Sequence, residues 1–493
     1  MKKVSYLLLS LLILPCLILF SGCGETEEPP VLTALNENMI TIDYTSTIYN
    51  GEEKKPAVTV KIEDVVVEDT NYTVEYKNNI NVGTAKVVVT AKEDSQIIKG
   101  SAIRTFSITR ISKTVSNYAE LVQTLQDPNY INIYCNGNIN IPANETLTIN
   151  EGVTLNIGQF NVDNNGTIVN NGNLVLNYKP TGVGTLTNNG FISANVTTRQ
   201  GILDAIGYAD KIILADTITG GVNVLDRIEF NGNNGPVNVT LDLNGHNLET
   251  NIAVRGHQTN KVVVRITNGS TATTSTIGTI NHNYGLIVLG NGSYKNGGGA
   301  ELSVTLNNLN FVGLDGGVAT NGQYKGGRIN ATNCTFEGKN YLDEDLTETC
   351  VGAYLPAQYA YEFKKCTFIG FTAYYAKSGE PHSLSSCTFE AKGAAYHDPS
   401  KYGDGCKPTG SAIVIDSSTN YQSPLKVFIA GNTVIKSTSG YGIEEFATFS
   451  EGETKVVYSE VTIMGTVKFE TAKDDYIERN IEFDVEDLEE NED

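Results

Sequence analysis

The sequence contains few basic residues, only 3 methionines and no tryptophan. Lysine and arginine together number 35 against 56 aspartates and glutamates, so the formal net charge is −21. A chain this acidic is repelled by the phosphate backbone of nucleic acids and offers no basic patch to an anionic membrane surface. Its 5 histidines and 8 cysteines show no spacing typical of a zinc site. We therefore expect no nucleic-acid partner and no zinc.

Residues that favour strands and turns dominate instead. Glycine occurs 48 times and tyrosine 25 times, and asparagine, threonine and valine are abundant. Asparagine and glycine suit tight corners because both tolerate left-handed backbone angles. A chain of 493 residues has room for several domains, or for one long solenoid with small appendages. These features predict an all-β protein.

A short phrase containing a phenylalanine recurs in the second half of the chain. Its copies are Asn308–Gly313, Asn333–Gly338, Lys365–Gly370 and Ser386–Ala391, with a weaker copy at Gly431–Lys436. A unit of roughly 20 to 25 residues, with longer gaps interpreted as insertions or a skipped unit, is typical of a solenoid. Short strand-like runs in each unit favour a parallel β-helix. We expect Phe311, Phe336, Phe368, Phe389 and Val434 to stack from coil to coil, with the glycines at corners.

Two helix signals divide the solenoid into two sections. Asn117–Glu120 reads as a capping box for a short helix, and Thr197–Gln200 begins a similar helix. We therefore predict a first section over residues 111–197 and a main β-helix over 198–472, and the sequence leaves open whether they form one rod. A helix before the first coil would shield its open end. Residues 473–493 form a predicted acidic, solvated tail.

The phrase Val239–Leu248 strongly resembles an early coil of pectate-lyase-like right-handed β-helix proteins. This resemblance covers roughly residues 112 to 470 and implies a right-handed parallel β-helix. It implies no single function, because the fold hosts lyases, hydrolases, adhesins and inert spacers.

The first 23 residues have the pattern of an export signal. A positively charged start precedes Leu7–Phe20, an apolar run too short for a comfortable membrane span. The run ends in Leu19-Phe-Ser-Gly-Cys23, which resembles the lipobox of bacterial lipoproteins. The resemblance implies cleavage before Cys23 and lipid attachment to its sulfur, which places the protein on a membrane, outside the cytoplasm. The alternative is an ordinary secretory signal. Residues 24–35 form a predicted tether.

Residues 36–110 contain alternating strand-like runs separated by turn residues, as in a small β-sandwich. Phrases such as Asn71–Asn79 and Asn81–Val89 resemble bacterial immunoglobulin-like surface repeats. This resemblance implies a spacer or adhesive module, and a stalk is the interpretation we favour.

The sequence contains only incomplete matches to known catalytic or metal-binding patterns. Arg255-Gly-His257 is the nearest fragment to a polysaccharide-cleaving site, but no paired aspartates flank it at coil spacing, so we interpret it as a loop. Two acidic insertions, Leu342–Asp345 and the stretch with His397, Asp398 and Asp404, have oxygen ligands suitable for Ca²⁺. Neither has the alternation of a known calcium loop, so solvated turns are the default.

Tyrosines give the better site hypothesis, because each offers a flat apolar face to a sugar ring and a hydroxyl to its edge. They gather where the coils carry insertions, which often lie on the binding face of a solenoid. The predicted ligand-binding residues are Tyr354, Tyr359, Tyr361, Tyr374, Tyr375, Tyr396 and Tyr402.

Six cysteines remain after the signal: Cys135, Cys334, Cys350, Cys366, Cys387 and Cys406. An even number in an exported chain permits disulfides. However, Cys334, Cys366 and Cys387 recur at one position of the coil, as buried hydrophobic residues do. We favour a mostly reduced stack, with Cys350–Cys406 as the alternative pair.

Together these features predict a monomeric surface lipoprotein whose β-helix serves adhesion or binds glycans without catalysis. The alternatives are a carbohydrate-active lyase or hydrolase, whose carboxylates converge only in three dimensions, and a passive spacer.

Overall fold

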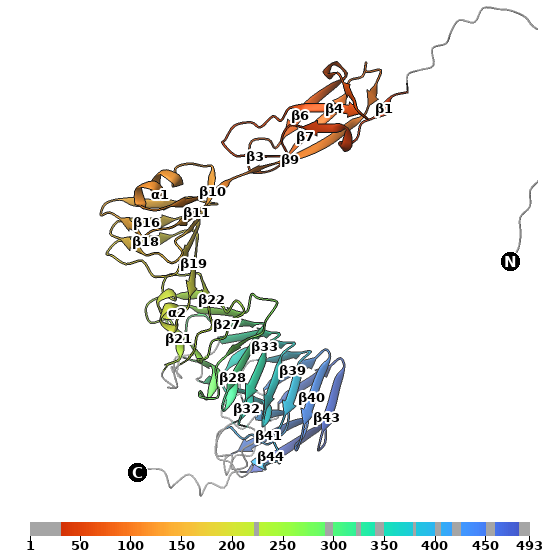
Figure 1. Cartoon of the computed structure of the whole chain (residues 1–493). Coiled ribbons are helices and arrows are strands. Elements are labelled where there is room, and N and C mark those ends of the chain that lie inside the picture. The colour runs from red at the N-terminus through yellow and green to blue at the C-terminus, as the bar shows by residue number, and fades with distance from the viewer. Residues whose placement is uncertain are drawn as a thin grey trace, which may run out of the picture. The chain divides into compact units, whose positions relative to one another are not determined.

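The computed structural model describes residues 31–220, 226–290, 299–321, 327–340, 350–377, 381–399, 406–416, 425–449 and 459–482. The chain divides into two compact units, Met1–Arg110 and Ile111–Asp493 (Figure 1). Among the described residues, no helix is long and apolar enough to cross a membrane.

The first unit consists of small sheets around one apolar core. One sheet contains β2 (Ile40–Ile42), β4 (Val58–Ile62) and β5 (Val65–Val67); another contains β3 (Ser46–Ile48), β9 (Ser101–Thr109), β7 (Gly83–Ala91) and β6 (Tyr72–Lys77); and β1 (Thr33–Ala34) pairs with β8 (Ile98–Lys99). Inward residues such as Val60, Val87 and Phe106 are buried between the two larger sheets. Alternating apolar residues therefore produce the strands that the sequence predicts in this region.

The second unit is a solenoid of parallel strands. Its longest sheet has fourteen strands: β10 (Ile111–Val115), β11 (Tyr130–Cys135), β14 (Thr154–Asn156), β17 (Asn173–Leu176), β19 (Phe191–Val196), β20 (Lys211–Leu214), β22 (Val237–Asp242), β24 (Val262–Thr267), β27 (Leu302–Asn307), β30 (Gly327–Thr332), β33 (Tyr359–Lys364), β36 (His382–Ser385), β39 (Lys426–Ala430) and β42 (Glu460–Met464).

Two further sheets complete the later coils. The seven-stranded sheet contains β25 (Ser275–Ile277), β28 (Leu309–Gly313), β31 (Thr335–Gly338), β34 (Thr367–Gly370), β37 (Thr388–Ala391), β40 (Thr433–Ser437) and β43 (Val467–Thr471). The nine-stranded sheet contains β21 (Ile228–Asn231), β23 (Ile252–Arg255), β26 (Tyr284–Leu289), β29 (Gly316–Asn321), β32 (Val351–Leu355), β35 (Thr372–Ala376), β38 (Ile413–Asp416), β41 (Ile443–Phe449) and β44 (Tyr476–Glu482). Each later coil adds one strand to each sheet, which agrees with the predicted parallel β-helix.

The earlier section has smaller sheets and two short helices. Strands β12 (Ile139–Ile141) and β15 (Val162–Asn164) form one pair, and β13 (Thr146–Ile149), β16 (Thr167–Asn170) and β18 (Thr185–Asn188) form a three-stranded sheet. Helix α1 (Tyr118–Leu125) is capped by the side chain of Asn117, as predicted, and α2 (Arg199–Ala205) by that of Thr198.

The two helix-led sections share one sheet. Strand β19 pairs with β20 in parallel, and β20 pairs with β22, so the fourteen-stranded sheet continues across the boundary at residues 197 and 198. The solenoid also extends beyond residue 472, because β44 lies within the predicted acidic tail and pairs with β41. The apolar residues Tyr476 and Ile477 at the start of β44 distinguish it from the acidic residues that follow.

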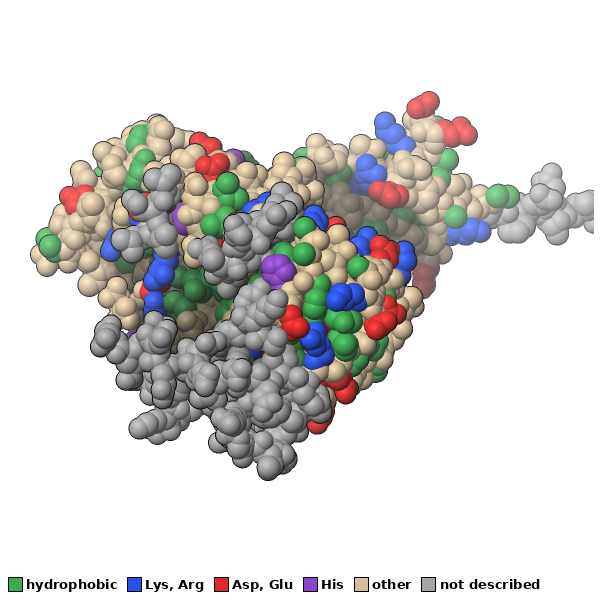
Figure 2. Space-filling model, turned by 90° about the horizontal axis from the view of Figure 1, so that it is seen from below, with side chains coloured by type: hydrophobic (Ala, Val, Ile, Leu, Met, Phe, Trp, Pro, Cys, Tyr) green, Lys and Arg blue, Asp and Glu red, His purple; other side chains and the backbone are tan. Residues whose placement is uncertain are grey.

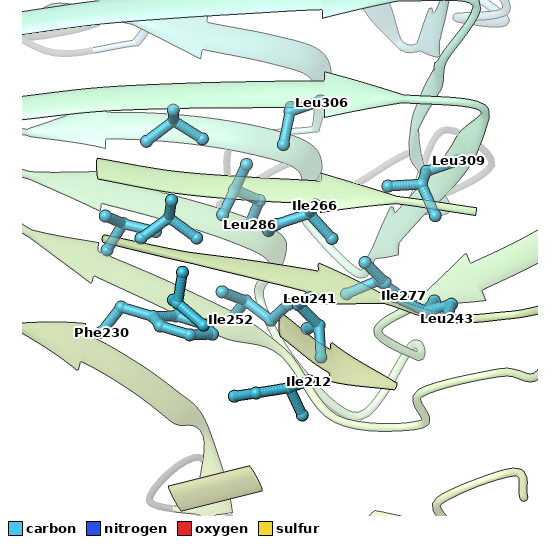
Figure 3. Packing of buried hydrophobic residues seen from close by; sticks show 14 of the residues in the cluster. Ile212, Phe230, Leu241, Leu243, Ile252, Ile266, Ile277, Leu286, Leu306 and Leu309 are labelled. Atoms are coloured by element: carbon cyan, nitrogen blue, oxygen red, sulfur yellow. The ribbon is translucent and has the colours of Figure 1, made fainter. Parts of the chain in front are cut away.

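Apolar side chains fill the inside of the solenoid from end to end. Figure 3 shows Ile212, Leu241, Ile266 and Leu306 from successive strands of the long sheet lying above one another. Charged side chains of both signs are mixed on the surface seen in Figure 2. The core is therefore one continuous column.

The phenylalanine stack is confirmed with one correction. The ring centroids of Phe311, Phe336, Phe368 and Phe389 follow one another at 5.3, 5.3 and 5.2 Å with nearly parallel planes. The next residue in register is Ile435, and the assignment of Val434 to this position was wrong. The register shifts because Thr388, two residues after the corner at Ser386, pairs with Val434, three residues after the corner at Gly431.

Left-handed corners link the fourteen-stranded and seven-stranded sheets. The residue that follows each of the strands β27, β30, β33, β36 and β39 has a positive φ: 59° at Asn308, 55° at Asn333, 54° at Lys365, 55° at Ser386 and 71° at Gly431. Asparagine and glycine adopt this conformation at little cost, whereas other residues lose about 1–2 kcal/mol. Lys365 and Ser386 therefore occupy strained positions that the stacking imposes.

Replacing Lys365 with asparagine should stabilise the solenoid. We expect the free energy of unfolding, measured by urea titration with circular dichroism, to rise by about 0.5–1 kcal/mol, because the strained conformation becomes acceptable. Lys364→Asn is the matched control, since it makes the same change in charge at an extended strand position where asparagine is disfavoured. Equal effects of the two substitutions would contradict the prediction.

Candidate functional site

Four of the tyrosines predicted to bind a ligand are buried. Tyr359 and Tyr361 in β33, and Tyr374 in β35, lie in the main core, and Tyr375 is also fully buried. The hydroxyl of Tyr361 donates to the carbonyl of Ala357 at 2.8 Å. The expectation that these four side chains present their faces to a ligand is therefore wrong, because strand alternation or overlying residues cover them.

The remaining predicted tyrosines differ in exposure. Tyr354 is half-buried and packs edge-on against Tyr375, with ring centroids 5.6 Å apart. Tyr396 is half-buried and lies outside the coil strands. Tyr402 lies outside the described residues, as does Cys23. Tyr396 therefore identifies the region where a site can be sought.

Tyr396 lies over the outward face of the nine-stranded sheet. One column of outward residues on this face, in register, is Tyr354, Tyr375, Val414 and Glu444. Residues 392–399 and 406–411, named here the covering segments, lie over it: the backbone N–H of Gly410 donates to Thr372 Oγ1 at 3.1 Å. Covering an outward sheet face in this way buries residues that would otherwise meet water.

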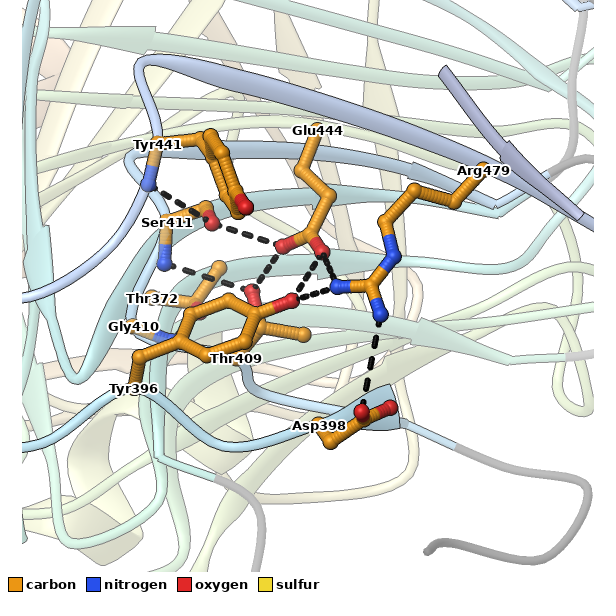
Figure 4. A network of polar contacts seen from close by, with 9 residues as sticks. All are labelled: Thr372, Tyr396, Asp398, Thr409, Gly410, Ser411, Tyr441, Glu444 and Arg479. Carbon is orange, nitrogen blue, oxygen red and sulfur yellow. Dashed lines mark hydrogen bonds and ion pairs between the residues drawn. The ribbon is translucent and has the colours of Figure 1, made fainter. Parts of the chain in front are cut away.

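The carboxylate of Glu444 is the centre of a polar network (Figure 4). Its Oε2 accepts hydrogen bonds from the hydroxyls of Thr409 and Ser411, both at 2.6 Å. Its Oε1 accepts from the Tyr396 hydroxyl at 2.6 Å and from Arg479 Nη1 at 3.2 Å. Glu444 is fully buried. Its charge is therefore satisfied by donors from both covering segments and from β44.

A half-exposed rim surrounds this buried carboxylate. The ring of Tyr396 lies edge-on to Tyr441 at 5.5 Å, and the Lys473 ammonium lies 3.6 Å from the Tyr396 ring centroid. Arg479 also contacts Asp398, with Nη2 3.5 Å from Oδ2. We call Tyr396, Tyr441, Lys473 and Arg479 the aromatic–cation rim.

The electrostatics favour hydrogen bonding over proton transfer. Burial and the adjacent Glu444 charge raise the pKa of Tyr396 above its ordinary value, so the phenol stays protonated at neutral pH. Glu444 has four donors on its two oxygens and no exposure to solvent, so it cannot reach a substrate as a general acid or base. The chemistry available at the surface is stacking on an aromatic ring and pairing with a cation.

The Arg255 and His257 fragment is structural. Arg255 Nε donates to Glu229 Oε1 at 3.0 Å, and Arg227 donates to the other oxygen. Burial raises the pKa of Glu229, but these hydrogen bonds outweigh it and hold the pKa below its ordinary value. His257 Nδ1 accepts from the backbone N–H groups of Thr259 and Asn260, which fixes a turn. His257 lies in a loop, as predicted, whereas Arg255 is the last residue of strand β23 rather than a loop residue.

No metal-binding cluster of histidine, cysteine and acidic residues occurs within the described ranges. Of the acidic insertions, Leu342–Asp345 and Asp404 lie outside those ranges. Asp398 pairs with Arg479, which competes with any cation for its oxygens.

All six cysteines in the described part of the chain have free thiols. Cys334, Cys366 and Cys387 are buried at equivalent positions of successive coils, and each thiol lies within hydrogen-bond distance of a backbone carbonyl. Burial raises the pKa of Cys135 to about 12 and that of Cys350 to about 11. Buried thiols with raised pKa values are inert, so Cys135 and Cys350 should be unreactive in the folded protein.

Comparison with known proteins gives no relative: no family model, no curated protein and no solved structure matches this chain.

Most of the site escaped sequence reasoning. Glu444, Tyr441, Lys473 and Arg479 were not among the predicted residues, although Asp398 was noted as a calcium candidate. One signal was present, since the apolar pattern of Tyr441–Phe446 is interrupted by two adjacent glutamates. A charge within a buried strand indicates a partner elsewhere in the chain.

Replacing Glu444 with glutamine should loosen the covering segments. The substitution keeps the volume but removes the charge that pairs with Arg479, so we expect the free energy of unfolding to fall by about 1–3 kcal/mol. Hydrogen exchange measured by mass spectrometry should accelerate in residues 406–411. Glu362→Gln, at an exposed carboxylate on β33, should change neither quantity, and unchanged exchange in the Glu444 variant would refute the anchoring role.

The buried thiols should resist modification in the folded protein. At mildly alkaline pH, Cys135 and Cys350 should react with a disulfide reagent only after addition of denaturant, because their raised pKa values keep them protonated. The half-buried Cys406 is the internal reference. Site-resolved labelling that shows Cys135 reacting as fast as Cys406 would contradict the burial of Cys135.

Proposed function

We propose that this chain is a cell-surface lipoprotein that binds a glycan or another surface ligand without catalysis. In this proposal, acyl chains on Cys23 anchor it to membrane lipid, an immunoglobulin-like module acts as a stalk, and a right-handed β-helix presents the binding face. The lipobox and the surface-repeat phrases support the first two parts, and the parallel coils support the third.

The observation that carries the binding proposal is the aromatic–cation rim. Tyrosine faces stack on the apolar face of a sugar ring, and lysine or arginine pairs with carboxylate or sulfate groups. Lys473 is exposed, and Tyr396 and Tyr441 are half-buried. The rings of Tyr396 and Tyr441 are nearly perpendicular, with centroids 5.5 Å apart, so they present aromatic faces in two orientations. The cations Lys473 and Arg479 lie beside them. This combination suits an acidic glycan better than a neutral one.

The buried network below the rim supports binding by rigidity. Glu444 holds both covering segments and Arg479 on one sheet face, so the rim residues lose little freedom when a ligand binds. The exposed ammonium of Lys473 would also attract an anionic group locally, against the repulsion of a molecule whose net charge is −21.

A carbohydrate-active enzyme is the second candidate, and one observation favours it. Asp398 and Glu444 both contact Arg479, which is the convergence of carboxylates with a cation that such enzymes use. Against it, Glu444 is fully buried and its oxygens are occupied. A passive spacer is the third candidate, and that function would make no use of the aromatic–cation rim.

A glycan array with the full-length chain in detergent tests the proposal. We expect retention of acidic glycans, and we expect Tyr441→Ala and Lys473→Ala each to weaken binding about tenfold, through lost stacking and a lost cation. Tyr178→Ala is the control, since this tyrosine is 55% exposed and lies far along the chain from the rim.

The three candidates give different results in this experiment. Release of shortened or unsaturated sugars from an acidic polymer, abolished by Asp398→Asn, would establish the enzyme instead. Absence of binding by the folded chain would leave the spacer. Equal loss of binding in the Tyr178 variant would show that the rim is not the site.

A further inference from the structure

A lysine and an aspartate face each other on adjacent coils beside the polar network. Lys377 follows the last residue of β35, and Asp416 is the last residue of β38. The two strands pair in register, with Ala376 opposite Ile415, so the next residues on each strand are neighbours across one coil step. Lys377 Nζ lies 3.6 Å from Asp416 Oδ2.

Both groups are removed from water. The side chain of Lys377 is 5% exposed and that of Asp416 is 0% exposed. The Tyr375 hydroxyl donates a hydrogen bond to the same Oδ2 atom of Asp416 at 2.8 Å. Tyr375 itself belongs to a small apolar cluster with Val414 and Phe446 on the outward face. An ammonium and a carboxylate therefore meet in a dry, preorganised environment.

We propose that Lys377 and Asp416 condense spontaneously into an isopeptide bond that joins the two coils. The Nζ lone pair attacks Asp416 Cγ, a C–N bond forms, and one C–O bond of the carboxyl group breaks. The ammonium loses two protons and the leaving oxygen takes both, so an ammonium and a carboxylate give one amide and one water molecule. The step needs no oxidant, cofactor or second substrate.

Three features of the site promote this reaction. Holding the two groups within contact distance replaces an encounter in solution, and exclusion of water opposes the reverse hydrolysis. Tyr375 is a positioning residue, since its hydroxyl points at the oxygen that becomes negative in the tetrahedral intermediate.

The state of Tyr375 agrees with that role. Burial, followed by the negative charge of Asp416, raises the pKa of Tyr375 well above its ordinary value, so the phenol remains a hydrogen-bond donor at neutral pH.

A second lysine–aspartate pair in the same solenoid provides an internal control. Lys211 Nζ lies 2.8 Å from Asp242 Oδ2, closer than the proposed pair, but the Lys211 side chain is 33% exposed. Its ammonium stays hydrated, and Asp242 also accepts hydrogen bonds from the backbone N–H groups of Asn244 and Gly269. We therefore expect an ordinary ion pair there and a covalent link only at the buried pair.

Mass spectrometry of the proteolysed full chain tests the proposal. We expect a branched peptide that joins residues 377 and 416, lighter by one water than its two parts, and separate unmodified peptides for residues 211 and 242. Fragmentation locates the branch at Lys377 rather than at the buried Lys407. Separate, unmodified peptides for residues 377 and 416 from the folded protein would overturn the proposal.

Variants separate the chemistry from a structural effect. Lys377→Arg keeps the charge but should abolish the branched peptide. Asp416→Asn should retain the link with loss of ammonia, and Tyr375→Phe should lower the fraction of linked chain at early times after synthesis without preventing folding. A branched peptide that persists in Lys377→Arg would assign the link to another residue and refute this one. The outcome is independent of ligand binding, because none of these residues belongs to the rim.

Discussion

In-register stacking of parallel strands is the constraint on which the rest of the structure depends. Each strand of the solenoid pairs with its equivalent one coil away, so residues distant in sequence become neighbours about 4.8 Å apart. The stacked rings of Phe336, Phe368 and Phe389 are one consequence. The equivalent cysteines and the shared left-handed corners are others. A side chain that suits its position in one coil must also suit the side chain above and below it.

The same constraint limits what the corners and seams accept. A Cβ atom at Gly317 would collide with the backbone of Phe336 and Glu337, because the nine-stranded and seven-stranded sheets approach closely there. Lys365 and Ser386, by contrast, keep a left-handed conformation that disfavours them. At Gly317, steric contact excludes any side chain. At Lys365 and Ser386, the backbone strain is small enough for the strand pairing on either side to outweigh it.

The sequence predicted the elements that repeat and missed those that do not. The phenylalanines could be identified because one residue type returns at one coil position. Tyr359 and Tyr361 could have been assigned to the core, since they alternate with outward Glu362 and Lys364 in β33. Tyr375 could not, because it points outward and is buried only by residues far along the chain. Two partners of Glu444, Tyr396 and Arg479, lie 48 and 35 residues away and outside the recurring phenylalanine phrases, so no sequence pattern connects them to it.

The buried carboxylates of Glu444 and Asp416 both lie on the outward face of the nine-stranded sheet, and their surroundings explain why the candidate sites are found there. Inside the solenoid a charge needs partners from the neighbouring coils, as the inward Glu445 has in Tyr476 of β44, but most positions there are apolar. On the outward face of the nine-stranded sheet, the covering segments bring hydroxyls, cations and carboxylates of their own, so Glu444 and Asp416 can be buried and still be paired. The two carboxylates occupy neighbouring columns of one sheet but have different partners. Glu444 receives hydroxyl and guanidinium donors, which occupy both of its oxygens and anchor the rim. Asp416 accepts a hydrogen bond from the Tyr375 phenol and pairs with the primary amine of Lys377. That amine can become a nucleophile once it has lost a proton. Because both carboxylates are fully buried, their different donors, and not a difference in burial, distinguish the one that anchors the structure from the one proposed to react.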